Sequence, residues 1–591
     1  EQAIIELFEN MGYDHLYAPD FDRDYTSPIL DSILRDSLVR INRGLPVEAI
    51  DEAMSKLKNF DTGSLLQKNM IFMDYLQNGV TIKFFVKGEE QSSIVRLIDY
   101  QNVKSNSFYV VNQLTFLENG NNRRPDIILF INGLPLVLME LKSPAKDEVG
   151  VENAYHQIRN YMQDIPSIFY YNAICVISDL STNKAGTITS GLDRFMEWKT
   201  KDGNYEDTAY ASFETFYEGM FQKERLLDIL KNFILFSGVS NSRFKVLAGY
   251  HQYFAVRKAI EKAKVATKTD GKGGVFWHTQ GSGKSLSMVF YAHLLQEALD
   301  SPTIVVITDR NDLDDQLYGQ FAKCKDFLRQ DPIHADKRKL SEQDKERNAR
   351  LRKGEKPLIG LMDWLNGRKA NGIIFTTMQK FEESFECLSE RRNIIVMADE
   401  AHRGQYGLKE KVDAKTGAIK VGTARVIRNA LPNATYIGFT GTPISMKDRN
   451  TREVFGDYID TYDMTQAVED GATRPVYYES RIINLKLDDA TLKLIDQEYD
   501  LMANNADPEV IEKSKKELGQ MEAILGNEKT INSLVDDILN HYENYRENLL
   551  TGKAMIVAYS RSIAMKIYER ILHERPSWTE KVAIVMTGSN K

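Results

Sequence analysis

Three charged side chains near residue 130 have the types and the spacing of a metal-dependent site that cuts phosphodiesters. Pro125-Asp126 is followed, after thirteen residues, by Glu140-Leu141-Lys142. Glu140 and Lys142 are two positions apart on a predicted strand and therefore point to the same face. The carboxylates of Asp126 and Glu140, together with the Leu141 carbonyl, are hard oxygen ligands of the kind that Mg²⁺ prefers. Beside such a metal, Lys142 is predicted to orient or activate the attacking water.

The turn before Glu140 decides whether the two carboxylates can meet. If Asn132-Gly133 forms a plain two-residue hairpin, Asp126 lies opposite Met139, and the two carboxylates fall on opposite sides of the sheet. We therefore predict a three-residue connection or a bulge, which places Asp126 opposite Glu140.

A following helix supports the nuclease interpretation. It carries Gln157 and Tyr161 in a Gln-x-x-x-Tyr pattern, an accessory feature of one branch of nucleases that would contact DNA or brace the site. Without this context, the pattern is weak, and a solvated pair of Glu140 and Lys142 on an edge strand is the favoured interpretation.

A second group of residues has the pattern of a phosphate-binding loop. A strand at 275–277 leads into a tight loop and then a helix, an arrangement in which loop amides and the helix N-terminus cradle phosphates. His278 stands where the usual Gly-x-x-x-x-Gly-Lys-Ser pattern has its first glycine, a position that helicase-type motors commonly relax. Lys284 is predicted to reach the β and γ oxygens, and the Ser285 hydroxyl to ligate Mg²⁺. The predicted ATP-binding residues of this loop are Thr279, Gln280, Gly281, Ser282, Gly283, Lys284 and Ser285.

Further along, an apolar strand at 394–398 ends in Asp399-Glu400. Asp399 is predicted to hold the Mg²⁺ shell, and Glu400 to orient or polarise the hydrolytic water. His402 is predicted to link the nucleotide site to Thr440 and Thr442. An isolated Asp-Glu-Ala-His is also compatible with a capped helix start, but its place after a phosphate loop favours a nucleotide-driven motor.

These blocks resemble superfamily 2 helicases and translocases. The resemblance makes Gln252 an adenine-reading glutamine and favours ATP; the alternative is a glutamine at a helix cap. Where this superfamily grips the nucleic-acid backbone, the chain has Thr308, Asp309, Arg310, Thr376 and Thr377, which could otherwise be turn residues with capping hydroxyls. Phosphate contacts of this type allow tracking along DNA without reading its sequence.

Composition limits the class of protein. With 591 residues, 42% of them hydrophobic and 27% charged, the chain has enough core for three to five domains. Its formal charge of −8 means that any DNA contact uses local patches. Cys175, Cys324 and Cys387 are far apart, which argues against a zinc site or disulfide framework and favours a reducing, cytoplasmic location. The apolar stretch 127–141 is too short to span a bilayer, so no membrane is expected.

We predict an α/β fold with four parts. Residues 1–211 form an endonuclease domain with a mixed sheet, residues 212–264 a helical connector, and residues 265–465 a first RecA-like motor lobe with a parallel sheet. Residues 466–591 form a second, incomplete RecA-like lobe, with strands near 476–478, 554–559 and 582–586 and a helical insertion near 488–527.

Taken together, the motifs resemble the restriction (R, motor) subunit of type I restriction-modification enzymes, over nearly the whole chain. The resemblance implies an enzyme that uses ATP and Mg²⁺ to pull and cut double-stranded DNA, with modification (methyltransferase) and specificity subunits as partners. Because the later motifs of the second lobe do not follow 558–561, we expect these 591 residues alone to bind nucleotide but to translocate poorly.

Other functions remain open from the sequence. One is a stand-alone nuclease-helicase of DNA repair, or a type III-like restriction subunit, although in the latter the nuclease normally follows the motor. Another is an ATP-gated DNA-binding scaffold with an inactive nuclease fold.

Overall fold

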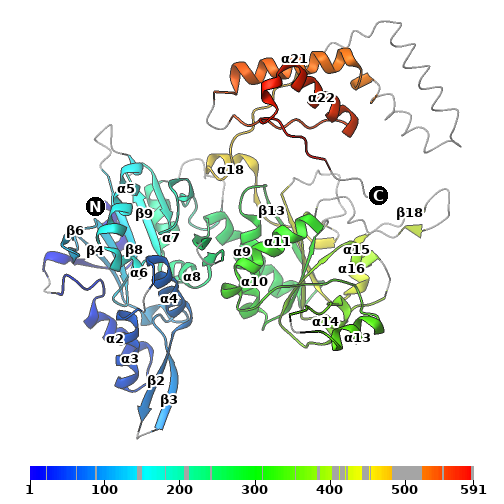
Figure 1. Cartoon of the computed structure of the whole chain (residues 1–591). Coiled ribbons are helices and arrows are strands. Elements are labelled where there is room, and N and C mark those ends of the chain that lie inside the picture. The colour runs from blue at the N-terminus through cyan, green and yellow to red at the C-terminus, as the bar shows by residue number, and fades with distance from the viewer. Residues whose placement is uncertain are drawn as a thin grey trace. The chain divides into compact units, whose positions relative to one another are not determined.

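The computed structural model of the chain is drawn in Figure 1. It describes all residues except 21–22, 61–62, 87–88, 143–149, 180, 205–211, 240–241, 309–310, 353, 383–385, 402–410, 413–418, 421–422, 442–451, 453, 482–521, 523, 549–551 and 587–591. The chain divides into two compact units, Glu1–Pro475 and Val476–Lys591.

The first unit begins with a mixed sheet of six strands, in the order β1-β4-β7-β8-β9-β10. Its central strands are apolar runs with almost every residue buried, which is why they form the middle of the sheet. The β1–β4 and β8–β9 pairs are parallel, and the other three pairs are antiparallel. The strands are β1 (Asp14–Tyr17), β4 (Phe108–Asn112), β7 (Ile127–Ile131), β8 (Leu134–Leu141), β9 (Ile174–Ser178) and β10 (Asn183–Gly186).

Helices and small hairpins surround this sheet. Helix α5 contacts β8 and β9, and its Ala154, Ile158 and Tyr161 are buried against the sheet. The other elements are the helices α1 (Gln2–Asn10), α2 (Asp31–Ile41), α3 (Val47–Lys58), α4 (Leu65–Asn78), α5 (Val151–Asp164) and α6 (Pro166–Tyr170), the short 3₁₀ turns η1 (Ala18–Asp20), η2 (Val103–Ser105) and η3 (Leu192–Arg194), and the hairpins β2 (Val80–Val86) with β3 (Glu89–Val95) and β5 (Phe116–Glu118) with β6 (Asn121–Arg123).

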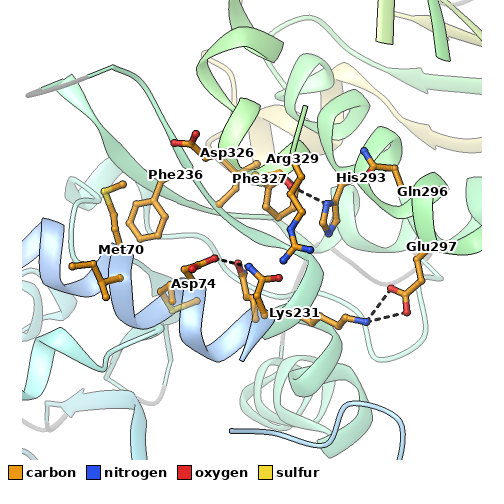
Figure 2. Close-up of a pocket in the computed structure, with 15 residues that line it drawn as sticks. Met70, Asp74, Lys231, Phe236, His293, Gln296, Glu297, Asp326, Phe327 and Arg329 are labelled. Atoms are coloured by element: carbon orange, nitrogen blue, oxygen red, sulfur yellow. Dashed lines mark hydrogen bonds and ion pairs between the residues drawn. The ribbon is translucent and has the colours of Figure 1, made fainter. Parts of the chain in front are cut away.

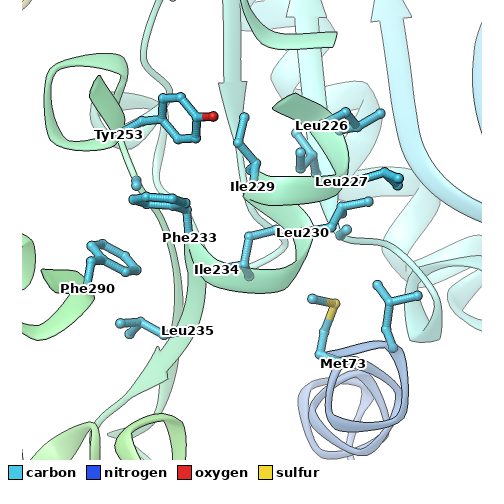
Figure 3. Close-up of a cluster of buried hydrophobic side chains, with 14 of the residues drawn as sticks. Met73, Leu226, Leu227, Ile229, Leu230, Phe233, Ile234, Leu235, Tyr253 and Phe290 are labelled. Carbon is cyan, nitrogen blue, oxygen red and sulfur yellow. The ribbon is translucent and has the colours of Figure 1, made fainter. Parts of the chain in front are cut away.

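The connector shares one hydrophobic core with the parts on either side of it. In Figure 3, Met73 of α4 lies beside leucines of α8, while Phe233 at the end of α8 packs toward Phe290 of the motor. The same buried cluster extends from Ile4 to Ala467. The connector elements are α7 (Phe213–Phe221), α8 (Lys223–Asn232), β11 (Ile234–Ser237), β12 (Phe244–Leu247) and α9 (Tyr250–Ala266).

The part predicted to be the motor contains a fully parallel seven-stranded sheet in the order β15-β16-β14-β17-β20-β13-β21. The strands predicted at 275–277 and 394–398 are confirmed as part of β13 and as β17. The strands are β13 (Lys272–His278), β14 (Thr303–Thr308), β15 (Ile333–His334), β16 (Ile373–Thr377), β17 (Ile394–Ala398), β20 (Thr435–Thr440) and β21 (Tyr458–Tyr462). The remaining elements are α10 (Lys284–Ala298), α11 (Asn311–Lys323), α12 (Lys325–Leu328), α13 (Glu342–Ala349), α14 (Leu361–Asn366), α15 (Gln379–Glu382), α16 (Thr423–Ala430), α18 (Met464–Glu469) and the hairpin β18 (Lys411–Val412) with β19 (Ile419–Lys420). Carboxyl ends of neighbouring parallel strands meet at one edge, where ligands bind in sheets of this type.

The second unit differs from the sequence prediction. Its described residues contain α21 (Glu528–Tyr545), α22 (Arg561–Glu574) and the short turn η5 (Pro576–Trp578), and among them no strand is present. The predicted strands 476–478, 554–559 and 582–586 are extended segments, and Tyr478, Val557 and Val585 in them are more than 80% exposed. A parallel strand forms only with neighbours on which to pair, and the buried residues here are those of the helix pair. The predicted helical insertion near 488–527 lies mostly outside the described residues.

Candidate nuclease and nucleotide sites

The hairpin of β7 and β8 contains the irregularity that the sequence predicts, within its strand pair and not in its turn. Asn132 and Gly133 both have positive φ, as a tight two-residue hairpin turn requires. The register then shifts by one residue between Leu129 and Phe130, so that Ile127 pairs with Met139 and not with Leu138. Continued by one residue, this register places Asp126 opposite Glu140, on the same face. The bulge is therefore confirmed.

The two carboxylates approach the end of β8 from adjacent strands. Asp126 Oδ2 accepts a hydrogen bond of 2.8 Å from the Leu141 amide, which fixes the carboxylate against the strand end. Glu140 is 4% exposed, and its Oε1 accepts a 2.7 Å hydrogen bond from Lys142 Nζ. Burial, and secondly the negative charge of Asp126, raise the pKa of Glu140 to about 7, while Lys142 and Tyr161 oppose that rise. Burial also raises the pKa of Asp126.

Tyr161 and Gln157 belong to this site. Both lie on α5, which covers the face of the sheet that carries the carboxylates. Burial and the charge of Glu140 raise the pKa of Tyr161, and the Gln157 side chain acts on the same hydroxyl through a hydrogen bond. The structure thus brings these two side chains to the carboxylate pair, and their role as a brace or as a DNA contact stays a prediction.

The residues present fit a divalent cation. The second oxygen of Glu140, Oε2, is buried and has no hydrogen-bond partner among the described residues, and two nearby carboxylates repel each other until a cation neutralises them. Asp126, Glu140 and the Leu141 carbonyl would hold Mg²⁺ through oxygen atoms alone. Among the described residues no group of three or more His, Cys, Asp or Glu side chains forms a metal cluster, so the site depends on this pair and on the backbone.

The loop that the sequence assigns to phosphate binding lies between β13 and α10, the predicted strand and helix. Gly281 and Gly283 have φ of +85° and +82°, which glycine adopts without strain. At the start of α10, Lys284 Nζ lies 3.2 Å from both Asp399 Oδ1 and Glu400 Oε1, at the end of β17. The structure thus brings together the three residues that the sequence assigns to phosphate, metal and water.

Glu400 holds its position at some conformational cost. Its φ is +50°, which is unusual for a residue with a side chain and is found at functional sites where the surroundings enforce it. The next amide, that of Ala401, donates to the Phe439 carbonyl of β20, next to the buried Thr440. His402 and Thr442, the other predicted coupling residues, lie outside the described residues.

Helix α9 supports the loop from one side. Gln252 donates from Nε2 to the Gly283 carbonyl at 3.0 Å and accepts from the Gly249 amide at 3.0 Å. His251 Nε2 lies 3.0 Å from the Ser282 carbonyl oxygen, and burial lowers the pKa of His251 to about 4, so the neutral ring donates this bond. Gln252 is buried next to the nucleotide loop, and in this structure its amide holds the backbone of that loop.

Strand β21 supports the loop from the other side, through residues that the sequence analysis missed. His278 is fully buried, and its Nε2 lies 3.0 Å from Asp460 Oδ1. Asp460 also accepts from Lys258 Nζ at 2.8 Å. The Thr279 amide donates to the Tyr462 carbonyl at 2.9 Å. His278 therefore replaces the usual glycine with a side chain that ties the loop strand to its neighbour. In the sequence, the only sign of this contact is the histidine at position 278, where the motif usually has a glycine.

Two family models match the chain. The N terminus of type I restriction enzyme R proteins matches residues 1–194, and the SWI2/SNF2 ATPase matches residues 251–512. The chain is 36% identical over 617 residues to the type I restriction enzyme HindI endonuclease subunit of Haemophilus influenzae, covering all of this chain and 56% of that one. Residues 1–194 thus match the family of type I restriction enzyme R-protein N termini, and the whole chain is similar to an endonuclease subunit of such an enzyme.

Other comparisons agree with this family. The chain is also 33% identical over 629 residues to the putative type I restriction enzyme MjaIXP endonuclease subunit of Methanocaldococcus jannaschii. That match covers all of this chain and 56% of the relative. The chain thus spans about half the length of the curated relatives it matches. A Sulfolobus solfataricus SWI2/SNF2 ATPase core in complex with double-stranded DNA is 17% identical, over 55% of this chain and 65% of that one, with a TM-score of 0.23, which is too low to support an argument.

The predicted DNA contacts of this chain are only partly described. Thr308 and Thr376–Thr377 end the neighbouring strands β14 and β16, so the structure brings them together. Their side chains are at most 2% exposed, and they do not face solvent. Asp309 and Arg310 lie outside the described residues. A DNA contact by this group therefore stays a prediction.

A cavity of about 640 Å³ lies between the nuclease and motor parts, away from both predicted sites (Figure 2). Its wall includes Asp74 of α4 and an ion pair between Lys231 of α8 and Glu297 of α10. His293 stacks on Phe327 with ring centroids 4.0 Å apart. None of the predicted site residues lines this cavity.

No described helix combines the length and the low polarity that crossing a bilayer requires.

Proposed function

We propose that this chain carries the motor and nuclease functions of a type I restriction enzyme. Within the assembled enzyme, it would use ATP hydrolysis to move along double-stranded DNA and would cut that DNA with a Mg²⁺-dependent nuclease, as a type I site-specific deoxyribonuclease. The observation that supports this best is the bulge that places Asp126 opposite Glu140, within the same compact unit as the contact of Lys284 with Asp399 and Glu400.

At the nuclease site, Asp126, Glu140 and the Leu141 carbonyl would hold Mg²⁺, which polarises the scissile phosphate and lowers the pKa of a bound water. Lys142 sits 2.7 Å from Glu140 Oε1, so it can keep that carboxylate ionised and orient the water that attacks phosphorus. Tyr161, with Gln157 behind it, keeps the Glu140 side chain in place.

At the motor site, the arriving phosphates would replace the two carboxylates as partners of Lys284, because the lysine is the cation of the loop. Ser285 and Asp399 would hold Mg²⁺ at the phosphates, and Glu400 would then be released to orient the hydrolytic water. The loop residues Thr279, Gln280, Gly281, Ser282 and Gly283 would bind the phosphates through their amides, with Gln252 reading adenine.

The remaining assignments belong to the same proposal. His402, Thr440 and Thr442 would couple the nucleotide site to movement, and Thr308, Asp309, Arg310, Thr376 and Thr377 would contact the DNA backbone. Modification and specificity subunits would anchor the complex on its recognition sequence, in the cytoplasm. Residues 1–211, 212–264, 265–465 and 466–591 would be the nuclease, connector and two motor lobes.

The test is to measure ATP hydrolysis and plasmid cutting by the full chain, with and without modification and specificity subunits. We expect Asp126→Asn to abolish cutting and to leave ATP hydrolysis intact, and Lys284→Ala to abolish both. Asp193→Asn, at an exposed carboxylate outside the site, is the matched control. If Asp126→Asn leaves cutting unchanged, the cutting does not depend on this site, which supports a scaffold with an inactive nuclease fold. If cutting needs no partner subunit, the stand-alone nuclease-helicase is favoured.

A further inference from the structure

The register of the first sheet aligns five residues in one row across its strands. Glu140 of β8 pairs with Ile177 of β9, and Ile177 pairs with Lys184 of β10. On the other side of Glu140, the row continues through Asp126 to Gln113, whose amide donates to the Asp126 carbonyl. Because directly opposed residues in a sheet point to the same face, Lys184 shares the face of the two carboxylates and lies level with them along the strands.

Burial patterns confirm which face this is. Ile177 packs in the hydrophobic cluster that contains Tyr161 of α5, on the carboxylate face. A Cβ placed on Gly186, two residues beyond Lys184, would lie 2.7 Å from the Phe195 ring of the same cluster. Ala185, between them, packs in the cluster on the opposite face. Lys184 therefore points toward the side of the sheet on which the nuclease site is built.

The Lys184 ammonium group has no partner in the part of the chain that the structure describes. No hydrogen bond or ion pair joins it to a described residue, and the side chain is half-buried. Lys142, by contrast, is bonded to Glu140. Holding a lysine half-buried without a counter-charge costs free energy, so its position is easier to explain if an anion binds there.

We propose that Lys184 is a second cation of the nuclease site and binds a phosphate of the DNA strand next to the one that is cut. Adjacent strands lie about 4.8 Å apart, so the Cα of Lys184 stands about 10 Å from that of Glu140, across β9. A flexible four-carbon side chain spans much of this distance. Lys142 would then serve the metal and the water, while Lys184 would place the backbone against the two carboxylates, which by themselves repel it.

This inference rests on the proposed nuclease function, and its test measures binding separately from cutting. The full chain is mixed with a 30-base-pair duplex and Ca²⁺, an oxygen-seeking cation that replaces Mg²⁺, and affinity is measured from 50 to 300 mM salt. We expect Lys184→Gln to weaken binding about three- to tenfold and to lower the slope of log affinity against log salt by about one, the loss of a single phosphate contact. Lys184→Arg should keep both values close to those of the unmodified chain.

The matched control is Lys83→Gln on the separate β2–β3 hairpin, where the lysine is paired with Glu90. It should change neither affinity nor slope. A purely structural role for Lys184 would lower stability without changing the salt slope, so an unchanged slope in Lys184→Gln overturns the proposal. If the slope falls but the unmodified chain never cuts DNA with Mg²⁺ and partner subunits, the phosphate contact stands and the proposed nuclease function fails.

Discussion

Glu140→Gln should stabilise the sheet around the nuclease site while it abolishes metal binding. Glu140 is buried beside Asp126, and its pKa in the fold is about 7, above its ordinary value of 4.5. An acid whose pKa is raised by folding destabilises the fold once it ionises. Glutamine has the same shape and never ionises, so the variant removes this cost.

The magnitude follows from the pKa shift. At roughly 1.4 kcal/mol per unit, the shift makes the ionised carboxylate cost about 3 kcal/mol at pH 8. At pH 5 the carboxyl group is neutral in the fold and only partly ionised in the unfolded chain, so the difference falls to about 1 kcal/mol. Saturating Mg²⁺ should remove most of the stability difference between the variant and the wild type at pH 8, because the metal binds only the ionised wild-type site. At a hundred times its Kd, Mg²⁺ stabilises that site by about 3 kcal/mol.

The assay is native-state hydrogen exchange of peptides from β8, with and without Mg²⁺, at pH 5 and pH 8, because exchange reports the opening of one region of a multidomain chain. Glu90→Gln, at an exposed glutamate of β3, is the control and should change protection by less than about 0.5 kcal/mol. Equal or weaker protection of β8 in Glu140→Gln at pH 8 without Mg²⁺ would refute the reasoning.

Three further substitutions test the nucleotide loop and the hairpin. Lys284→Ala removes the cation that faces Glu400 and should weaken ATP binding about 10- to 100-fold, measured by titration with a fluorescent nucleotide; unchanged affinity would contradict the loop assignment. His278→Gly restores the usual motif but breaks the buried hydrogen bond to Asp460, and should lower the free energy of unfolding of the motor part by about 3 kcal/mol in denaturant. An unchanged free energy of unfolding would show that this hydrogen bond does not stabilise the fold. Gly133→Ala, at φ +82° with its Cβ 2.6 Å from a backbone carbonyl oxygen, should destabilise the hairpin by more than about 1 kcal/mol in the same assay, and a more stable variant would exclude that turn geometry.

Some of this architecture could be derived from the sequence, because the chemistry left few alternatives. The β7–β8 bulge was predictable since Asp126 and Glu140 share a face in that register and not in a plain hairpin. The parallel strands of the motor were visible as apolar runs, each followed by residues with recognisable chemistry. The bulge and these strands are determined by residues close together in the sequence, so the sequence is enough to predict them.

Other features depend on contacts between distant residues. Asp460 is 182 positions from His278 and looks like an ordinary polar residue of an edge strand. Lys184 lies in a short polar segment, and only the pairing of β9 with β10 places it beside Ile177. The segments near 557 and 585 have strand-like composition, yet composition alone does not supply the neighbouring strand that each needs.

The uninterrupted hydrophobic core that joins nuclease, connector and motor limits how such a chain can be shuffled. If the nuclease part were replaced by that of a distant relative, its side chains facing α8 would differ from those present here. The mismatch would leave voids or clashes in the shared core. Chimeras joined before the connector should therefore fold worse than chimeras that carry α7 to α9 along with the nuclease. Recombination between relatives would be tolerated better after this interface than within it.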